Sequence, residues 1–157
     1  MVTKPSSFYT VRFNDCDPLA HLNNSKYLDY FLNAREDQVK EHYGIDLKEW
    51  AGRGLGFVVS RHEIQYIRAV TYNEVICIVT ALVGYGDSHL DVEMLMYDKH
   101  QKILKAILWT KFTHISSRTG KRDQLNSEIM GWVSNALITE VDLEKGMNAR
   151  IGELLNK

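Results

Sequence analysis

The stretch NDCDPLAHLNN, residues 14–24, decides how the chain is organised. It gathers two carboxylates, a thiol, an imidazole and several amides between a strand-like run at residues 8–13 and a helical pattern that follows. Helix is disfavoured at Asp17 because the ring of Pro18 crowds the residue before it. The stretch is therefore predicted to be a polar loop, suited to a turn with a helix cap, a metal site or a catalytic loop.

A long helix is predicted directly after this loop. Asn23 or Asn24 can cap it, because an asparagine side chain accepts a hydrogen bond from an unpaired amide of the first turn. Gly44 is a suitable residue for the C-terminal end. Helical spacing is followed by Leu28, Phe31, Leu32, Arg35 and Val39.

Four later segments have the patterns of strands, at residues 57–67, 74–83, 88–97 and 103–115. The connections GYGD and DKHQK are short, which predicts an antiparallel meander. One long apolar helix followed by such strands predicts an α+β fold in which a curved antiparallel sheet wraps a central helix. The segment 74–83 is more apolar than one helix can cover. We therefore expect the outer face of the sheet to pack on a second subunit, in a homodimer or homotetramer.

The composition is that of a soluble globular protein, with 157 residues, 45% apolar and 25% charged. A formal charge of −1 gives no reason to expect nucleic-acid or membrane binding. Cys16 and Cys77 form no CxxC pair, and the N-terminal residues lack the apolar core of a signal peptide, so we expect a cytoplasmic protein with reduced thiols. Residues 1–137 are predicted to form one domain. Residues 138–157 are predicted to be a C-terminal extension with a helical segment at 144–155.

The run VRFNDCDPLAHLNNSKYLDYF, residues 11–31, resembles the hotdog-fold acyl-CoA thioesterases, in particular the 4-hydroxybenzoyl-CoA thioesterase-like family. Members have a strand, an aspartate-containing loop, a His-x-Asn-Asn or related sequence, and then a helix. The HLNN segment is also similar to the loop of acyl-ACP thioesterases, and weaker similarity continues to about residue 135. The resemblance implies a hotdog fold and hydrolysis of acyl-CoA or acyl-ACP thioesters, with no metal or other cofactor.

The resemblance also implies roles for the loop residues. It puts the catalytic aspartate on Asp17, acting as general base or as nucleophile. It puts the amide that polarises the thioester carbonyl near Asn24, where a helix N-terminus can serve as an oxyanion hole. His21 could orient Asp17 or a water, and Asn23 could fix the loop.

Substrate contacts are expected along the helix and in basic loops. The acyl tunnel is expected near the dimer interface, lined by Tyr27, Phe31 and Phe57. The CoA phosphates would be bound by basic side chains. The candidates are Arg61, Arg68, Arg118, Lys121 and Arg122.

Several alternatives stay open at this stage. Other branches of the fold carry the carboxylate on the helix, where Glu36 and Asp37 are candidates. Asp15, Asp17 and His21 could together ligate a metal, although no further ligand is evident. A Cys16 nucleophile would need a matched base. An enoyl-thioester hydratase or dehydratase and a non-catalytic acyl-thioester binding module are the rival functions.

Overall fold

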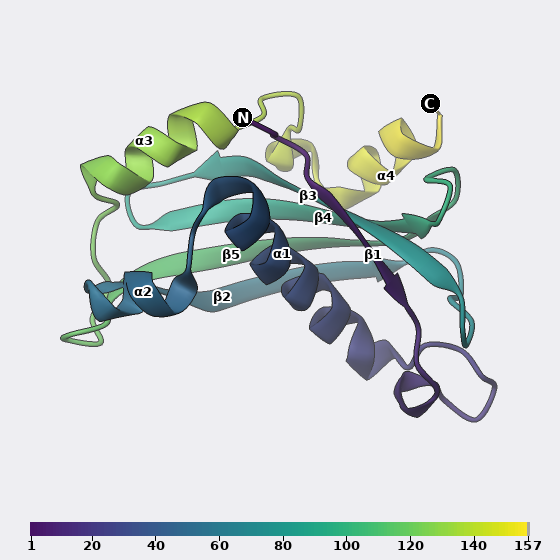
Figure 1. Ribbon diagram of the computed structural model, residues 1–157. Coiled ribbons are helices and arrows are strands. Elements are labelled where there is room, and N and C mark those ends of the chain that lie inside the picture. The colour runs from purple at the N-terminus through teal and green to yellow at the C-terminus, as the bar shows by residue number, and fades with distance from the viewer. Residues whose placement is uncertain (157) are drawn as a thin grey trace.

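Five antiparallel strands form one sheet in the computed structural model, which describes residues 1–156 (Figure 1). Their order across the sheet is β1-β3-β4-β5-β2. The bounds are β1 Ser6–Thr10, β2 Leu55–Tyr66, β3 Val75–Tyr85, β4 His89–Asp98 and β5 Leu104–Ser116. The predicted meander is confirmed for β3, β4 and β5, which are consecutive in both chain and sheet.

Strand β2 lies at the far edge of the sheet, away from β3, which follows it in the chain. It pairs along its length with β5, from Leu55 opposite Ser116 to Tyr66 opposite Ala106, with a register shift between Val59 and Arg61. Strand β1 forms the opposite edge. The short connections correctly predict that β3, β4 and β5 are neighbours. The connection from β2 to β3 instead passes from one side of the sheet towards the other, so these two strands are not paired.

The long helix α1, Tyr27–Tyr43, crosses the face around which the sheet curves (Figure 1). It ends as predicted at Gly44, whose φ of +65° suits glycine and whose amide donates to the carbonyls of Lys40 and Val39. Phe31 of α1 is fully buried against the sheet, together with Met94 and Leu108. A long helix wrapped by a curved antiparallel sheet is the hotdog arrangement, so the predicted fold is confirmed.

Two short helices complete the cover on the α1 side of the sheet. They are α2, Leu47–Gly52, capped by Asp46, and α3, Ser127–Ala136, capped by Asn126. The predicted inner face of β4 is confirmed, because alternate residues of this strand are buried in the same core. They are Leu90, Val92, Met94 and Met96. Within residues 1–156, the helices are all too short or too polar to cross a lipid bilayer.

The opposite face of the sheet is covered by residues of the same chain. After α3, the chain forms a short 3-10 turn η3, Leu143–Lys145, and helix α4, Met147–Leu155. Ile138 and Val141 pack on Ala81 and Val83 of β3, and Met147 packs on the outer residues of β4 and β5. The expectation that a second subunit covers this face is wrong where these residues lie, because the extension itself shields the apolar surplus of β3.

Candidate active site

The loop after β1 closes on itself through backbone hydrogen bonds. The Asp17 amide donates to the His21 carbonyl at 2.8 Å, and the Ala20 amide donates to the Asp17 carbonyl at 3.0 Å. Ala20 has a φ of +59°, which lets the chain reverse in so few residues. The Leu22 amide then donates to the Val70 carbonyl at 2.7 Å. The loop is thereby fixed against residues 69–73 before the helix starts.

The carboxylate of Asp17 is held by this turn. Its Oδ1 accepts hydrogen bonds from the amides of Leu19, at 2.9 Å, and of His21, at 3.1 Å. Within residues 1–156, Oδ2 accepts none, and the residue is half-buried. One carboxylate oxygen is therefore anchored, while the other remains available to a water molecule or to a substrate.

The neighbouring carboxylate, Asp15, is engaged in the structure of the loop. Its Oδ2 accepts a 2.6 Å hydrogen bond from the Tyr30 hydroxyl on α1, and its carbonyl accepts from the Asn23 amide at 2.8 Å. Burial, followed by the hydrogen bond to Asp15, raises the pKa of Tyr30 to about 12. Asp15 thus ties the loop to the helix, whereas Asp17 has an oxygen to spare.

The helix start offers a backbone donor beside the loop. Asn23 is the cap, since its Oδ1 accepts from the Ser25 amide at 3.0 Å and its carbonyl accepts from the Lys26 amide at 2.8 Å. A 3-10 turn η2, Asn24–Lys26, then leads into α1. The Asn24 amide has no acceptor among residues 1–156. Such unpaired amides at a helix N-terminus favour negative charge.

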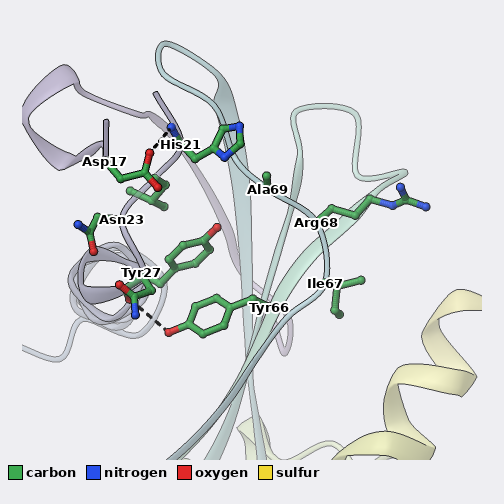
Figure 2. A pocket seen from close by; sticks show the side chains of 10 residues that line it. Asp17, His21, Asn23, Tyr27, Tyr66, Ile67, Arg68 and Ala69 are labelled. Atoms are coloured by element: carbon green, nitrogen blue, oxygen red, sulfur yellow. Dashed lines mark hydrogen bonds between the residues drawn. The ribbon is translucent and has the colours of Figure 1, made fainter. Parts of the chain in front are cut away.

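These groups line one open cavity of about 410 Å³, between the loop, the start of α1 and the end of β2. Figure 2 shows Asp17 and His21 on one side and Tyr66 and Arg68 on the other, with the Arg68 side chain directed away from Asp17. The full lining is Asp17, His21, Leu22, Asn23, Asn24, Tyr27, Tyr66, Ile67, Arg68 and Ala69. The cavity combines a carboxylate, an imidazole and helix amides in a space large enough for a small ligand.

Tyr66 is a lining residue that the sequence analysis missed. Its hydroxyl donates to the Asn24 carbonyl at 3.2 Å, and its ring packs edge-on against Tyr27 with centroids 4.8 Å apart. It is the last residue of a strand followed by IRA, and the sequence offers no signal that this strand end meets the helix start.

Other predicted site residues lie elsewhere. Phe31 is buried in the core, and Phe57 lines a second cavity further along α1. Arg61 forms an exposed ion pair with Glu63. Asp37 accepts a hydrogen bond from Tyr9, and Glu36 lines the second cavity.

The basic segment 118–122 follows β5, whose end pairs with the start of β2. Since Asp17 faces the other end of β2, roughly 35 Å of strand separates the two regions within one chain.

The alternative chemistries find no support in the loop. In residues 1–156, no three His, Cys, Asp or Glu side chains gather as a set of metal ligands. The pKa of the Cys16 thiol is raised by desolvation and by the carboxylates of Asp15 and Asp17. A raised pKa disfavours the thiolate that a cysteine nucleophile requires.

Comparison with known families identifies the chain at the level of its family. The family model described as Thioesterase-like superfamily matches residues 11–133, which includes the loop, the helix and all but the first strand. The chain belongs to the Thioesterase-like superfamily. Thioester hydrolysis is therefore the class of reaction to which this fold and loop point, while the substrate is left open. A search of curated proteins found no match.

Solved structures of other proteins share the fold at low sequence identity. The DHNA-CoA thioesterase from Staphylococcus aureus is 16% identical, with a TM-score of 0.74, covering 98% of this chain and 93% of that one. YbaW, a probable thioesterase from Escherichia coli, is 21% identical, with a TM-score of 0.73, over 83% and 97%. The protein SAV2348 from Staphylococcus aureus, solved in complex with CoA, is 14% identical, with a TM-score of 0.77, over 90% and 91%.

Proposed function

We propose that this thioesterase-like protein hydrolyses acyl thioesters of CoA or acyl-carrier protein, with Asp17 as the catalytic carboxylate and the Asn24 amide as the oxyanion donor. The observation that carries the proposal is the state of Asp17. One oxygen is fixed by two backbone amides, and the other is unpaired in the cavity that Asn24 also lines. CoA is favoured as a carrier because the similar protein SAV2348 was solved with CoA.

The anchored Asp17 can act in two ways. As a general base, Oδ2 takes a proton from water, the resulting hydroxide adds to the thioester carbonyl carbon, and the C–S bond then breaks to release the free acid and the thiolate. As a nucleophile, Oδ2 adds to that carbon, the C–S bond breaks, and water then hydrolyses the anhydride. In both routes the carbonyl oxygen becomes negative. A donor such as the Asn24 amide is worth about 10²–10³ in rate when it meets that oxygen.

His21 and Asn23 support catalysis by Asp17. Neither has to protonate the leaving group, since a thiolate is a good leaving group. The His21 amide already holds Oδ1 of Asp17, and its imidazole lies at the cavity wall, where it can hydrogen-bond a water. Asn23 keeps the helix start in place through its cap. Tyr27 closes the floor of the cavity, and Arg68 at the rim carries no ion pair within residues 1–156, so it is available to a CoA phosphate.

We further propose a homodimer formed through the edge strand β2. Val58 and Val59 on this strand are 43% and 42% exposed, and the strand pairs only on its β5 side. Exposed apolar edges are sites of strand pairing between chains. Two-fold antiparallel pairing would set the start of one β2 beside the end of the other. The basic segment 118–122 of one copy would then approach the Asp17 cavity of the other.

Release of free thiol tests the proposed reaction. Wild type is assayed with Ellman's reagent against short, medium, long and aromatic acyl-CoAs, beside Asp17→Asn, which keeps the shape and removes the base. Glu36→Gln is the matched control, because Glu36 is an exposed carboxylate on the helix and a candidate for the alternative arrangement. We expect Asp17→Asn to lose at least about 10²-fold in kcat and Glu36→Gln to retain activity. Loss with Glu36→Gln alone would move the catalytic carboxylate to the helix.

A further inference from the structure

A second cavity of about 390 Å³ lies under the C-terminal half of α1, between that helix, α2, α3 and the start of β2. It shares no lining residue with the Asp17 cavity. Its walls are almost entirely apolar and aromatic. They include Leu32, Val39, Trp50, Phe57, Phe112 and Trp132. Such a lining with few polar groups is typical of a pocket for a small apolar ligand.

One buried cation interrupts this apolar lining. Arg35 follows Tyr27 and Phe31 at intervals of four residues on the core-facing stripe of α1, and it is only 7% exposed. Within residues 1–156 no carboxylate pairs with it. Burial lowers the pKa of Arg35 to about 10, which leaves the side chain charged at neutral pH. An unpaired buried charge is costly, so its retention in this cavity needs a reason.

The protein meets only part of the hydrogen-bonding capacity of Arg35. Nη1 donates to Thr80 Oγ1 at 3.0 Å, and the Tyr43 hydroxyl also favours the charged form. The guanidinium otherwise stacks near the rings of Tyr43 and Trp132, at 5.9 and 5.8 Å from their centroids. A guanidinium has five N–H donors, so most of them remain for a ligand in the cavity.

A second unmet donor lies beside the first. Nε1 of Trp132 is the one fully buried side-chain nitrogen or oxygen that lacks a hydrogen-bond partner in residues 1–156. Leaving such a donor unpaired costs about 1–3 kcal/mol. Trp132 and Arg35 line the same cavity and are in ring contact. Two neighbouring side chains with unmet N–H donors, one of them charged, match a carboxylate.

The acidic residue at this cavity does not neutralise Arg35. Glu36 lines the cavity, but it is the next residue of α1, and adjacent helical side chains diverge. It is exposed and forms no ion pair with Arg35. The cation is therefore left for an incoming ligand.

We infer that this cavity binds an apolar chain or ring that ends in a carboxylate, with the carboxylate on Arg35 and Trp132. The inference deepens the proposed thioester hydrolysis, on which it rests, by naming the substrate class. The carboxylate is either the far end of a dicarboxylic acyl group or the head of a released fatty acid. Both carry the same chemistry. In the dimer proposed above, this cavity at the start of β2 would adjoin the Asp17 cavity of the second copy.

Calorimetric measurement of binding to the protein of residues 1–157 tests the site without turnover. The probes are dodecanoic acid, dodecanedioic acid and methyl dodecanoate, which has the same chain without a charge. We expect each acid to bind at least about tenfold more tightly than the ester, because the ester cannot form a charge-assisted hydrogen bond. Equal binding of acid and ester by wild type would overturn the inference.

Three variants locate the binding. Arg35→Met removes the charge at similar length, and Trp132→Phe keeps an aromatic ring while removing the N–H. We expect both to bring the affinity for the acids close to that for the ester, with the larger loss for Arg35→Met. Glu41→Gln is the matched control, because Glu41 is an exposed carboxylate of α1 outside this cavity, and it should bind the acids as wild type does. If Arg35→Met does not fold, Trp132→Phe decides, and an unchanged preference for acids in that variant would contradict the assignment.

Turnover separates the two sources of the carboxylate. Mono-CoA thioesters of dodecanedioic and dodecanoic acid are compared in wild type and Trp132→Phe by thiol release. A kcat/KM advantage of the dicarboxylic substrate that disappears in the variant identifies the far carboxylate of the acyl group. Preferential binding of acids without that advantage identifies the released acid. Binding of the acids without any thiol release would refute the proposed hydrolysis but support the carboxylate site. Thiol release without preferential binding of the acids would support the hydrolysis and refute the carboxylate site.

Discussion

Arg150 of α4 and Glu93 of β4 form a buried two-point ion pair on the outer face of the sheet. Nη2 lies 2.8 Å from Oε1, and Nε lies 3.0 Å from Oε2. The indole Nε1 of Trp109 also donates to Oε2, at 3.0 Å. The pair joins the C-terminal segment to the middle of the sheet, 57 positions away in the chain. It fixes α4 on a largely apolar face, together with a hydrogen bond that Gln65 of β2 donates to Asn148 Oδ1 at 2.8 Å.

Arg150→Met is expected to destabilise the protein by about 3–5 kcal/mol, because Glu93 is left buried without a counter-charge. Urea unfolding at pH 7 measures the loss. Glu153→Gln is the control, since Glu153 is an exposed partner of the same arginine, and it should change stability by less than about 1 kcal/mol. A double replacement of Glu93 and Arg150 by Met should recover much of the loss. An Arg150→Met variant as stable as wild type would show that the pair does not hold α4.

The cover of the outer face of the sheet is a feature that the sequence predicts only in part. The apolar surplus of residues 74–83 was correctly predicted to need a cover. A single sequence does not show which surface provides that cover, because the contacts of Ile138 and Met147 with the sheet are non-local. The inner face of β4 and the end of α1 at Gly44 were predictable, since they depend on periodicity and on one residue's φ.

The loop was predictable to a similar extent. Its position between strand and helix follows from Asp17-Pro18 and the asparagines. The cap falls on Asn23, one of the two candidates. The unequal use of the two oxygens of Asp17 depends on the turn geometry, which the sequence does not specify. Arg35 was visible on the apolar stripe of the helix, but the lack of an acidic partner is a property of the fold.

Burial of the Tyr30 phenol, together with its hydrogen bond to Asp15, predicts a loss of stability at high pH. The pKa of Tyr30 is raised from 10.0 to about 12 in the folded protein, so folding favours the neutral phenol. This contribution is complete below pH 10 and is lost as the pH rises towards 12. Tyr30→Phe should be less stable than wild type at pH 8, and the difference should shrink between pH 10 and 12. Urea midpoints at pH 8, 10 and 11 measure it, and a difference that does not change with pH would contradict the assignment.

Arg68 is expected to bind a phosphate of CoA and to leave the chemistry unchanged. Arg68→Ala should raise KM for an acyl-CoA about tenfold, since a charged hydrogen bond contributes about 1.5–3 kcal/mol, with kcat within about twofold. The matched substrate is the same acyl group on pantetheine, which lacks the phosphates, and its KM should not change. Lys145→Ala is the control variant, because Lys145 is an exposed cation paired with Asp142 and lies outside both the Asp17 cavity and β2. Equal increases in KM for both substrates would place Arg68 on the acyl side.

The exposed edge of β2 predicts that assembly and activity are linked. Replacing Val58 and Val59 together by Lys should give a monomer, because lysines on an edge strand oppose pairing between chains. Light scattering after gel filtration measures the mass. Phe8→Lys is the matched control, since Phe8 is 55% exposed on the opposite edge strand β1, and it should leave the dimer intact. The monomer should keep its fold by circular dichroism but lose most of its thiol release, because its Asp17 cavity lacks the neighbouring surface of the second copy. Full activity in a monomer would reject the edge-paired dimer as the active form.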